Sequence, residues 1–284
     1  PEAVIARGRA YRAAGNLDAA RADFEAARAL GGDAVQIERH VASLSPRVQN
    51  PEATVPPGYR WSARISASRT SFSPDRDGWD DQELSLRHHF TRGSLALELL
   101  RAERFGRDDT AWALDAYTPL WNRAYANLRY QSGGGLLPDQ SWRAEVFQGV
   151  GRGWELSGSY DHLDFGSGTD LYGVGVGRYV GNYYMRYKAL YVGGSGNVSH
   201  RGTLRNYYEG NGDDYVEITA GTGRSNEVGD GQFDRSLRRS KSSLGVAWVK
   251  YFHPQWGFKL GANYANDVDG FDERRINASL YSRW

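Results

Sequence analysis

Apolar and polar residues alternate along most of the chain from Tyr59 to the C-terminus. Trp61, Ala63 and Ile65 are separated by serine and arginine residues, and later segments repeat the same period of two. Such a period places one set of side chains on each face of a β-strand. We count about fourteen such strands of roughly 9 to 12 residues, long enough to cross a bilayer at a tilt. About twelve or about sixteen strands are the alternatives.

The connections between these strands are alternately short and long. The short ones fall at 91–93, 119–122, 151–153, 181–182, 210–213 and 252–255. The long ones include SPDRDGWDD and SNEVGDGQFDRSLRRSK, and we expect the latter to be the longest surface excursion. This asymmetry is typical of outer-membrane β-barrels, in which an even number of strands places both chain ends on the short-turn side.

A water-soluble β-sandwich also alternates, but it buries its apolar face. Here the opposite face carries Arg, Lys, Asp or Glu in almost every strand. A closed barrel of this size has room for such charges inside, and lipid accepts its apolar outer face. We therefore predict a mainly β fold, a transmembrane antiparallel β-barrel over residues 59–284.

Aromatic residues mark the expected strand ends, where interfacial girdles of a membrane barrel lie. The tryptophans at these places are Trp61, Trp112, Trp142, Trp154, Trp256 and Trp284. Because the chain ends in Trp284 on an alternating strand, INASLYSRW, its C-terminus resembles the assembly signal of outer-membrane barrels.

Residues 1–45 have a helical pattern instead, dominated by Ala, Leu, Arg and Glu, with Asn16 placed to cap a second helix. Small and aromatic residues recur at the spacing of a tetratricopeptide repeat: Gly8, Tyr11, Ala20, Phe24 and Ala27. The segment resembles such a repeat, in which small residues let two helices approach and the two rings fill the adjoining space. An ordinary helical hairpin is the alternative. Prolines at residues 46–58 predict a linker.

The composition of the chain excludes several kinds of functional site. The chain has 284 residues, a formal net charge of +1 and no cysteine. The absence of cysteine excludes disulfide frameworks, cysteine metal sites and cysteine nucleophiles. The near-zero charge gives no global attraction to nucleic acid.

A helical repeat, a proline-rich linker and a C-terminal barrel resemble the YaiO-type outer-membrane barrel family. The segments that carry the resemblance are GNYYMRYKALYV, SHRGTLRNYYEGNGDDYVEITAGTG and INASLYSRW. The barrel of that family is similar to the export pores of exopolysaccharide secretion proteins, such as those for cellulose. The resemblance implies a non-enzymatic channel or scaffold associated with exopolysaccharide export.

The barrel pattern predicts the location, since the short-turn side of such barrels faces the periplasm, and the resemblance implies the partners. We expect the barrel in the bacterial outer membrane and the helical segment in the periplasm, where its repeat would dock export proteins. The expected partners are outer-membrane lipids and lipopolysaccharide, a polysaccharide and periplasmic export proteins, with no nucleic acid.

If the apolar parity faces lipid, the opposite parity lines the lumen. The candidates for a substrate path are Arg60, Arg64, Arg87, Arg123, Arg129, Arg143, Glu145, Arg186, Lys188, Arg201, Arg205, Glu217, Tyr125 and Tyr207. Further inward positions are Glu83, Glu98, Asp115, Glu155, Asp161, Tyr215, Lys259, Tyr281 and Arg283. Aromatic faces and charged groups would bind a saccharide. Rings of arginine and carboxylate would select anions in a small-solute pore. Pairing of all the charges would plug the lumen.

A barrel enzyme that modifies lipid or polysaccharide is the alternative function. Its candidate residues are His88, His89, His162 and His200, of which His89 faces inward. Adjacent strand residues point to opposite faces, so Asp161 cannot orient His162. No G-x-S-x-G nucleophile motif occurs, and we predict no catalytic residue.

The acidic segments DRDGWDD, NGDD and DVDGFDE offer oxygen ligands. They lack the final glutamate of an EF-hand calcium loop. We therefore expect no metal site, and we expect no cofactor.

Overall fold

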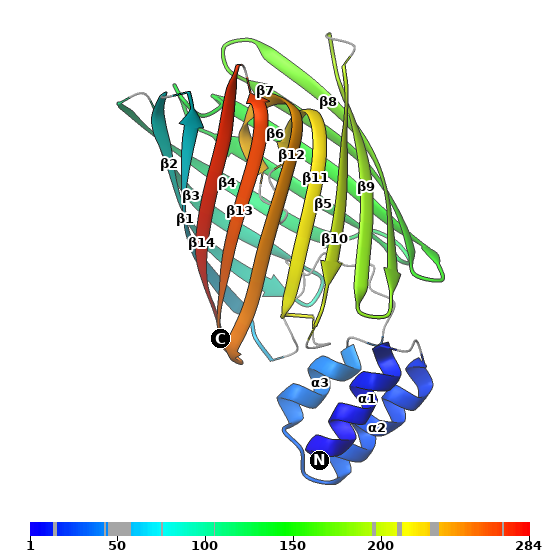
Figure 1. The fold of residues 1–284 in the computed structure, drawn as a ribbon. Coiled ribbons are helices and arrows are strands. Elements are labelled where there is room, and N and C mark those ends of the chain that lie inside the picture. The colour runs from blue at the N-terminus through cyan, green and yellow to red at the C-terminus, as the bar shows by residue number, and fades with distance from the viewer. Residues whose placement is uncertain are drawn as a thin grey trace.

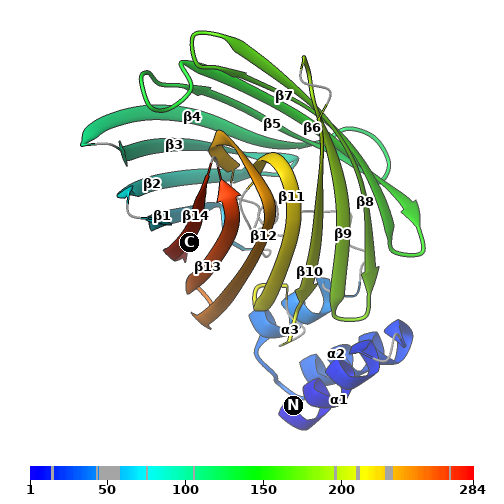
Figure 2. The same cartoon turned by 45° about the horizontal axis from the view of Figure 1, so that its top comes forward.

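The structure, a computed structural model, describes residues 1–13, 16–42, 44, 58–74, 76–104, 106–194, 197–208, 212–227, 233–268 and 270–284. Within these residues, fourteen antiparallel strands form a closed barrel in which each strand pairs with its neighbours in sequence (Figure 1). The prediction of about fourteen strands is therefore confirmed. Figure 2 shows the strands around a single interior, with the helices outside it.

The strands have the following bounds. They are β1 (Trp61–Ser73), β2 (Arg76–Phe90), β3 (Gly93–Arg104), β4 (Arg107–Pro119), β5 (Ala124–Ser132), β6 (Gln140–Gly151), β7 (Trp154–Asp164), β8 (Gly168–Val180), β9 (Tyr183–Val192), β10 (Val198–Asn206), β11 (Tyr215–Glu227), β12 (Phe233–His253), β13 (Trp256–Val268) and β14 (Phe271–Arg283).

The first and last strands close the barrel. β1 pairs with β14 in a register that sets Ser62 opposite Arg283. The C-terminal residue completes the seam, since the backbone N–H of Trp284 donates to the carbonyl of Trp61 at 3.0 Å. Closure leaves no sheet edge with unpaired backbone groups, which is what a strand in lipid requires.

Apolar side chains lie on the outside of the barrel. Ile65 is 60% exposed and Val174 is 68% exposed, and both alternate with residues that face inward. The outward-facing residues of β1 change from apolar to charged between Ala67 and Arg69. Arg69 pairs with the exposed Asp80 at 3.1 Å. This change marks one limit of the apolar band. The outward Trp61 and Trp284 lie at the opposite limit, as interfacial aromatics do.

One end of the barrel, here called the short-turn rim, carries the turns 91–92, 152–153 and 181–182 together with the start of β1 and the end of β14. The other end is the long-loop rim. β10 ends at Asn206 and β11 begins at Tyr215, so the connection at the short-turn rim that we expected at 210–213 is longer than expected.

Two expected long loops are mostly strand. Within SPDRDGWDD, β2 begins at Arg76, and within SNEVGDGQFDRSLRRSK, β11 continues to Glu227 and β12 begins at Phe233. The expected loop is therefore strand at 225–227 and 233–241, and 228–232 lie outside the described residues. Neighbouring strands continue past the apolar band because pairing satisfies their backbone N–H and C=O groups.

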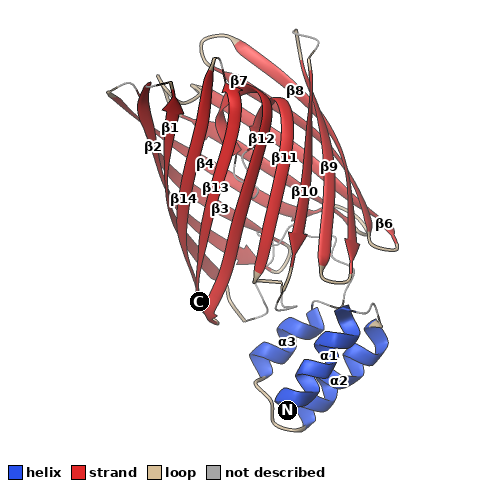
Figure 3. Cartoon of the chain, viewed as in Figure 1, coloured by secondary structure: helices blue, strands red, loops and turns tan. Residues whose placement is uncertain are grey.

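The N-terminal segment consists of α1 (Glu2–Ala13), α2 (Leu17–Ala29) and α3 (Ala34–Ala42), drawn in blue in Figure 3. Asn16 caps α2 by accepting a hydrogen bond from the N–H of Ala19. The core of the segment is small and apolar, and it contains Ile5, Ala20, Phe24, Ala27, Ile37 and Leu44. The expected linker at 46–58 lies outside the described residues apart from Gly58.

Close approach of α1 and α2 depends on Gly8. A Cβ atom at this position would lie 2.7 Å from Cε1 of Phe24, so only glycine fits without movement of the ring. Phe24 is fully buried and stacks on His40 at 4.9 Å between ring centroids. Tyr11, expected to fill the same space, is instead 38% exposed.

The helical segment lies beyond the short-turn rim, near the ends of β8, β9 and β10 (Figure 1). A guanidinium N–H of Arg12, at the end of α1, donates to the side-chain carbonyl of Asn182 in the β8–β9 turn at 2.9 Å. Arg12 is buried. No helix among the described residues is both long enough and apolar enough to cross a membrane.

Candidate functional site in the barrel interior

Charged residues on the first five strands form ion pairs inside the barrel. Arg64 on β1 pairs with Glu83 on β2, and it lies 3.8 Å from Glu98 on β3. Glu98 also pairs with Arg129 on β5. Since β3 and β5 are not neighbours, this pair passes over the intervening strand through the interior.

A second pair of the same kind joins β2 to β4. Arg87 donates to Asp115 at 2.5 Å and to the hydroxyl of Ser94 at 2.9 Å. Asp115 in turn accepts from the side-chain amide of Asn127 at 2.9 Å. Both charges are therefore satisfied within the barrel wall, as buried ionised groups require.

Glu145 on β6 is the centre of a network on the opposite side. It pairs with Arg186 and, at 3.2 Å, with Lys188, both on β9. Glu145 and Lys188 are almost fully buried. Arg143 pairs with Asp161 on the adjacent β7. The carboxylate of Glu145 thus compensates two cations at once.

Arg205 and Glu217 form a further buried pair, between β10 and β11, at 2.6 Å. The guanidinium of Arg205 also lies over the ring of Tyr215, with its carbon 4.2 Å from the ring centroid. An arginine held by both a carboxylate and an aromatic face is fixed in orientation.

Aromatic residues line the interior near the short-turn rim, and we call this set the inner tyrosine belt. Its ring pairs join β5 to β6, β8 to β9, the end of β10 to β11, and β12 to β14. They are Tyr125–Phe147, Tyr179–Tyr184, Tyr207–Tyr215 and Tyr251–Tyr281, with centroids 4.5, 4.4, 5.7 and 6.1 Å apart. The belt presents phenol hydroxyls and ring faces at one level of the interior.

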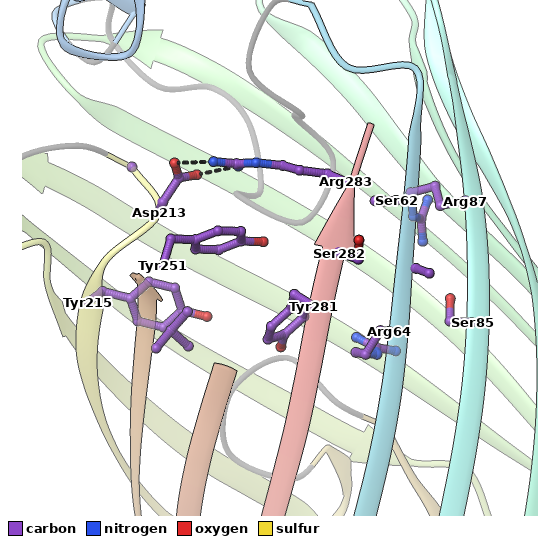
Figure 4. Close-up of a pocket in the computed structure, with 13 residues that line it drawn as sticks. Ser62, Arg64, Ser85, Arg87, Asp213, Tyr215, Tyr251, Tyr281, Ser282 and Arg283 are labelled. Atoms are coloured by element: carbon purple, nitrogen blue, oxygen red, sulfur yellow. Dashed lines mark hydrogen bonds and ion pairs between the residues drawn. The ribbon is translucent and has the colours of Figure 1, made fainter. Parts of the chain in front are cut away.

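A cavity of about 110 Å³ lies beside this belt, between β1–β2 and β11–β14 (Figure 4). Tyr215, Tyr251 and Tyr281 form one wall in Figure 4. Ser62, Arg64, Ser85 and Arg87 form the opposite wall. Groups that donate or accept hydrogen bonds therefore face the cavity from both sides.

Arg283 covers the cavity on the side of the chain ends. It forms two parallel bonds to the carboxylate of Asp213, at 3.0 and 2.9 Å, and a third bond from Nε to the carbonyl of Pro254 at 2.5 Å. Its guanidinium carbon lies 4.2 Å from the ring centroid of Tyr251. The residue thus joins the end of β14 to the β10–β11 and β12–β13 connections.

Most of the residues predicted for a substrate path lie in this interior. Arg143, Glu145, Lys188, Arg205, Glu217, Tyr125 and Tyr207 are buried, and Arg64, Arg87, Arg129, Arg186 and Arg201 are half-buried. Two lie elsewhere. Arg60 is exposed and precedes β1. Arg123 is exposed in the turn between β4 and β5, with a φ of 59°. The alternation of apolar and polar residues in the sequence continues past the strand ends. Parity therefore predicted these two arginines inside the barrel, although they lie outside the strands.

The cavity also contains residues that the sequence analysis missed. Tyr251, Ser62 and Ser85 have the inward parity, so alternation could have identified them. Asp213 belongs to a connection, where no period exists, and only the fold brings it to Arg283.

The histidines divide between the two faces. His89 lies half-buried on the inward side, and its Nε2 is 3.0 Å from the hydroxyl of Ser62. His162 bonds to Asp170 at 2.7 Å, His200 bonds to Tyr187 at 2.6 Å, and His88 packs against the outward Trp61. Among the described residues no group of three potential metal ligands occurs.

Comparison with known proteins agrees with the architecture. The family model described as the YaiO membrane beta barrel domain matches residues 61–228. The Acinetobacter baumannii outer membrane protein Omp33 superposes with a TM-score of 0.53 at 10% identity, covering 80% of this chain and 100% of that chain.

Two other solved structures are less similar. A bacterial polysaccharide outer membrane secretin has a TM-score of 0.47 at 10% identity, covering 80% of this chain and 99% of that chain. A mutant of Rh. blastica porin has a TM-score of 0.44 at 7% identity, covering 78% of this chain and 99% of that chain. Comparison with curated proteins gave no match. A closed barrel with an apolar exterior, together with a family match over more than half of its length, identifies this chain as an outer-membrane β-barrel of the YaiO family.

Proposed function

We propose that this protein is a non-enzymatic outer-membrane channel or scaffold for exopolysaccharide export, with its short-turn rim toward the periplasm. The observation that carries the proposal is the interior, where paired charges lie next to the inner tyrosine belt. Tyrosine combines a ring face with a hydroxyl, and these two properties match the apolar faces and hydroxyl groups of sugars. Because these charged side chains are paired with one another, they would not bind a passing polymer tightly.

Planar-bilayer conductance of the purified full chain tests the transport part. We expect single-channel current that soluble oligosaccharides reduce in a concentration-dependent way. If saccharides leave the current unchanged and the current is selective for inorganic anions, the result would support the small-solute pore instead. A barrel that is folded but electrically silent would overturn the channel and leave the scaffold.

The helical segment is proposed to dock periplasmic export proteins. Its position beyond the short-turn rim and the Arg12–Asn182 hydrogen bond support this role. Leu17 and Val35 are apolar and 41% exposed. A photo-crosslinking residue at Leu17 should capture a periplasmic protein in cells, whereas the same residue at Ile65, on the lipid-facing exterior, should not. Equal capture at both positions would contradict docking.

A second candidate function is favoured by the Ser62–His89 contact. In an acyl-ester hydrolase, the hydroxyl oxygen of Ser62 would attack the ester carbonyl while Nε2 of His89 accepts the hydroxyl proton. That proton would then leave with the alcohol, and water would release the acyl group. Such a site would modify lipid or polysaccharide esters at the barrel mouth.

A fluorophosphonate probe separates this candidate from the first. The enzyme predicts labelling that Ser62→Ala and His89→Ala abolish and that Ser94→Ala retains. An unlabelled barrel would exclude a reactive serine at this position.

A further inference from the structure

We propose that the cavity between β1–β2 and β11–β14 is a binding subsite for one uncharged pyranose unit of a saccharide chain. This inference rests on the proposed function, since it takes a saccharide as the cargo of the barrel. It adds a location, a charge class and the hydrogen-bonding groups that receive the sugar. The cavity has a volume of about 110 Å³ and lies inside the short-turn rim.

Hydroxyl groups from separate strands converge on this space. Tyr215, Tyr251 and Tyr281 contribute phenol groups from β11, β12 and β14, and Ser62 and Ser85 contribute hydroxyls from β1 and β2 (Figure 4). A hydroxyl can both donate and accept a hydrogen bond. A ring with several hydroxyl groups of its own is the kind of ligand that such a surface satisfies.

Ser85 is the most informative of these groups. It is 6% exposed and lines the cavity, and its hydroxyl forms no hydrogen bond among the described residues. This hydroxyl faces the cavity, where it can donate a hydrogen bond to a ligand hydroxyl or accept one from it.

Gly257 preorganises the tyrosine wall. This residue lies on β13 directly between Tyr251 and Tyr281 in the sheet register. A Cβ atom there would lie 2.8 Å from Cγ of Tyr251, so any other residue would displace the ring. Because β13 has no side chain at this level, the two tyrosine rings stack across it at 6.1 Å.

The ion pairs around the cavity indicate that the bound sugar is uncharged. Arg64 pairs with Glu83, Arg87 pairs with Asp115, and Arg283 pairs with Asp213. An acidic sugar would have to compete with these carboxylates, and a cationic sugar would meet three guanidinium groups. An uncharged sugar can accept guanidinium N–H donors without disturbing the pairs.

Isothermal titration of the full chain in detergent tests the subsite. Maltohexaose and cellohexaose serve as neutral probes, hexagalacturonate as the acidic probe and a chitosan hexamer as the cationic probe. We expect a neutral probe to bind most tightly. Tyr281→Phe removes a single hydroxyl and should weaken that binding about fivefold, the effect of one hydrogen bond. Ser85→Leu fills the space and should abolish it.

Tyr264→Phe is the matched control, because Tyr264 is on the exterior and bonds to Asp272 at 2.9 Å. This variant should bind as the unaltered protein does. Retained heat-modifiability of each variant on gels shows that its barrel is folded. Stronger binding of a charged probe, equal binding by Tyr281→Phe, or no binding of any probe would each overturn the subsite.

The titration and the conductance measurement can fail separately. A silent barrel with Tyr281-dependent binding would keep the subsite and overturn the channel. A conducting barrel that saccharides block equally in the unaltered and Tyr281→Phe proteins would keep the channel and overturn the subsite.

Discussion

The helical segment has a single apolar core, whereas the barrel also buries many charged side chains in its interior. Ile5, Phe24 and Ile37 form the core of the helical segment, whereas the barrel buries Glu145 and Lys188 and exposes leucines such as Leu99. Burial alone therefore does not define an apolar core in this protein. The surroundings decide: water outside the helices favours apolar burial, and lipid outside the barrel favours apolar exposure.

The largest expected effect concerns the buried charges. Glu145→Ala leaves Arg186 and Lys188 without their shared carboxylate, and loss of one partner in a buried pair costs about 3–5 kcal/mol. Asp108→Ala breaks the exposed Arg101–Asp108 pair and should cost about 0–1 kcal/mol. Urea unfolding in lipid vesicles, followed by tryptophan fluorescence, measures both. Equal costs would mean that water fills the interior around Glu145.

A charge on the lipid-facing side gives the next largest effect. Leu99 is 52% exposed on β3, and Leu99→Arg should destabilise the barrel by about 2–4 kcal/mol if it lies near the midplane of the bilayer. Leu30→Arg, at a residue 59% exposed in the helical segment, is the control and should leave barrel unfolding unchanged. The same unfolding assay compares them. A neutral Leu99→Arg would contradict contact with lipid.

Overpacking of the helical core should have a smaller effect. Gly8→Val forces a side chain against Phe24, where even a Cβ would be 2.7 Å from the ring, and such insertions cost about 1–3 kcal/mol. Loss of circular dichroism at 222 nm on heating should occur earlier in this variant. The barrel transition should not move, and a shift of both transitions would show that the two regions unfold together.

The smallest effect is a pH dependence of the helical segment. Hydrogen bonds from Arg7, at 2.8 Å, lower the pKa of Asp23 below its usual value. A lowered pKa in the folded state adds stability at pH values above the unfolded pKa, about 4, and this stability is lost as pH falls through the folded pKa. Helix melting should therefore shift down only in acid, and Asp23→Asn should remove that shift. An equal shift in the variant would assign the effect to another group.

Much of the barrel could be predicted from the sequence because lipid and lumen impose a strict period of two. Alternation around Ile65 and Leu99 identified the lipid-facing parity, and the same parity placed Arg64, Glu98 and Arg129 inside. It failed for Arg123, since a turn has no alternation to follow. It also failed for the length of β12, because backbone pairing continues past the apolar band.

The sequence by itself determined the fold class, the two unlike regions and the parity of the strands, because each depends on local periodicity. Only the tertiary structure decided which charges meet and where a cavity forms. Asp213 lies in the β10–β11 connection and Arg283 at the end of β14, 70 residues further along the chain, and barrel closure brings them to 2.9 Å. Such contacts depend on strand register and on the curvature of the whole sheet, which no single segment specifies.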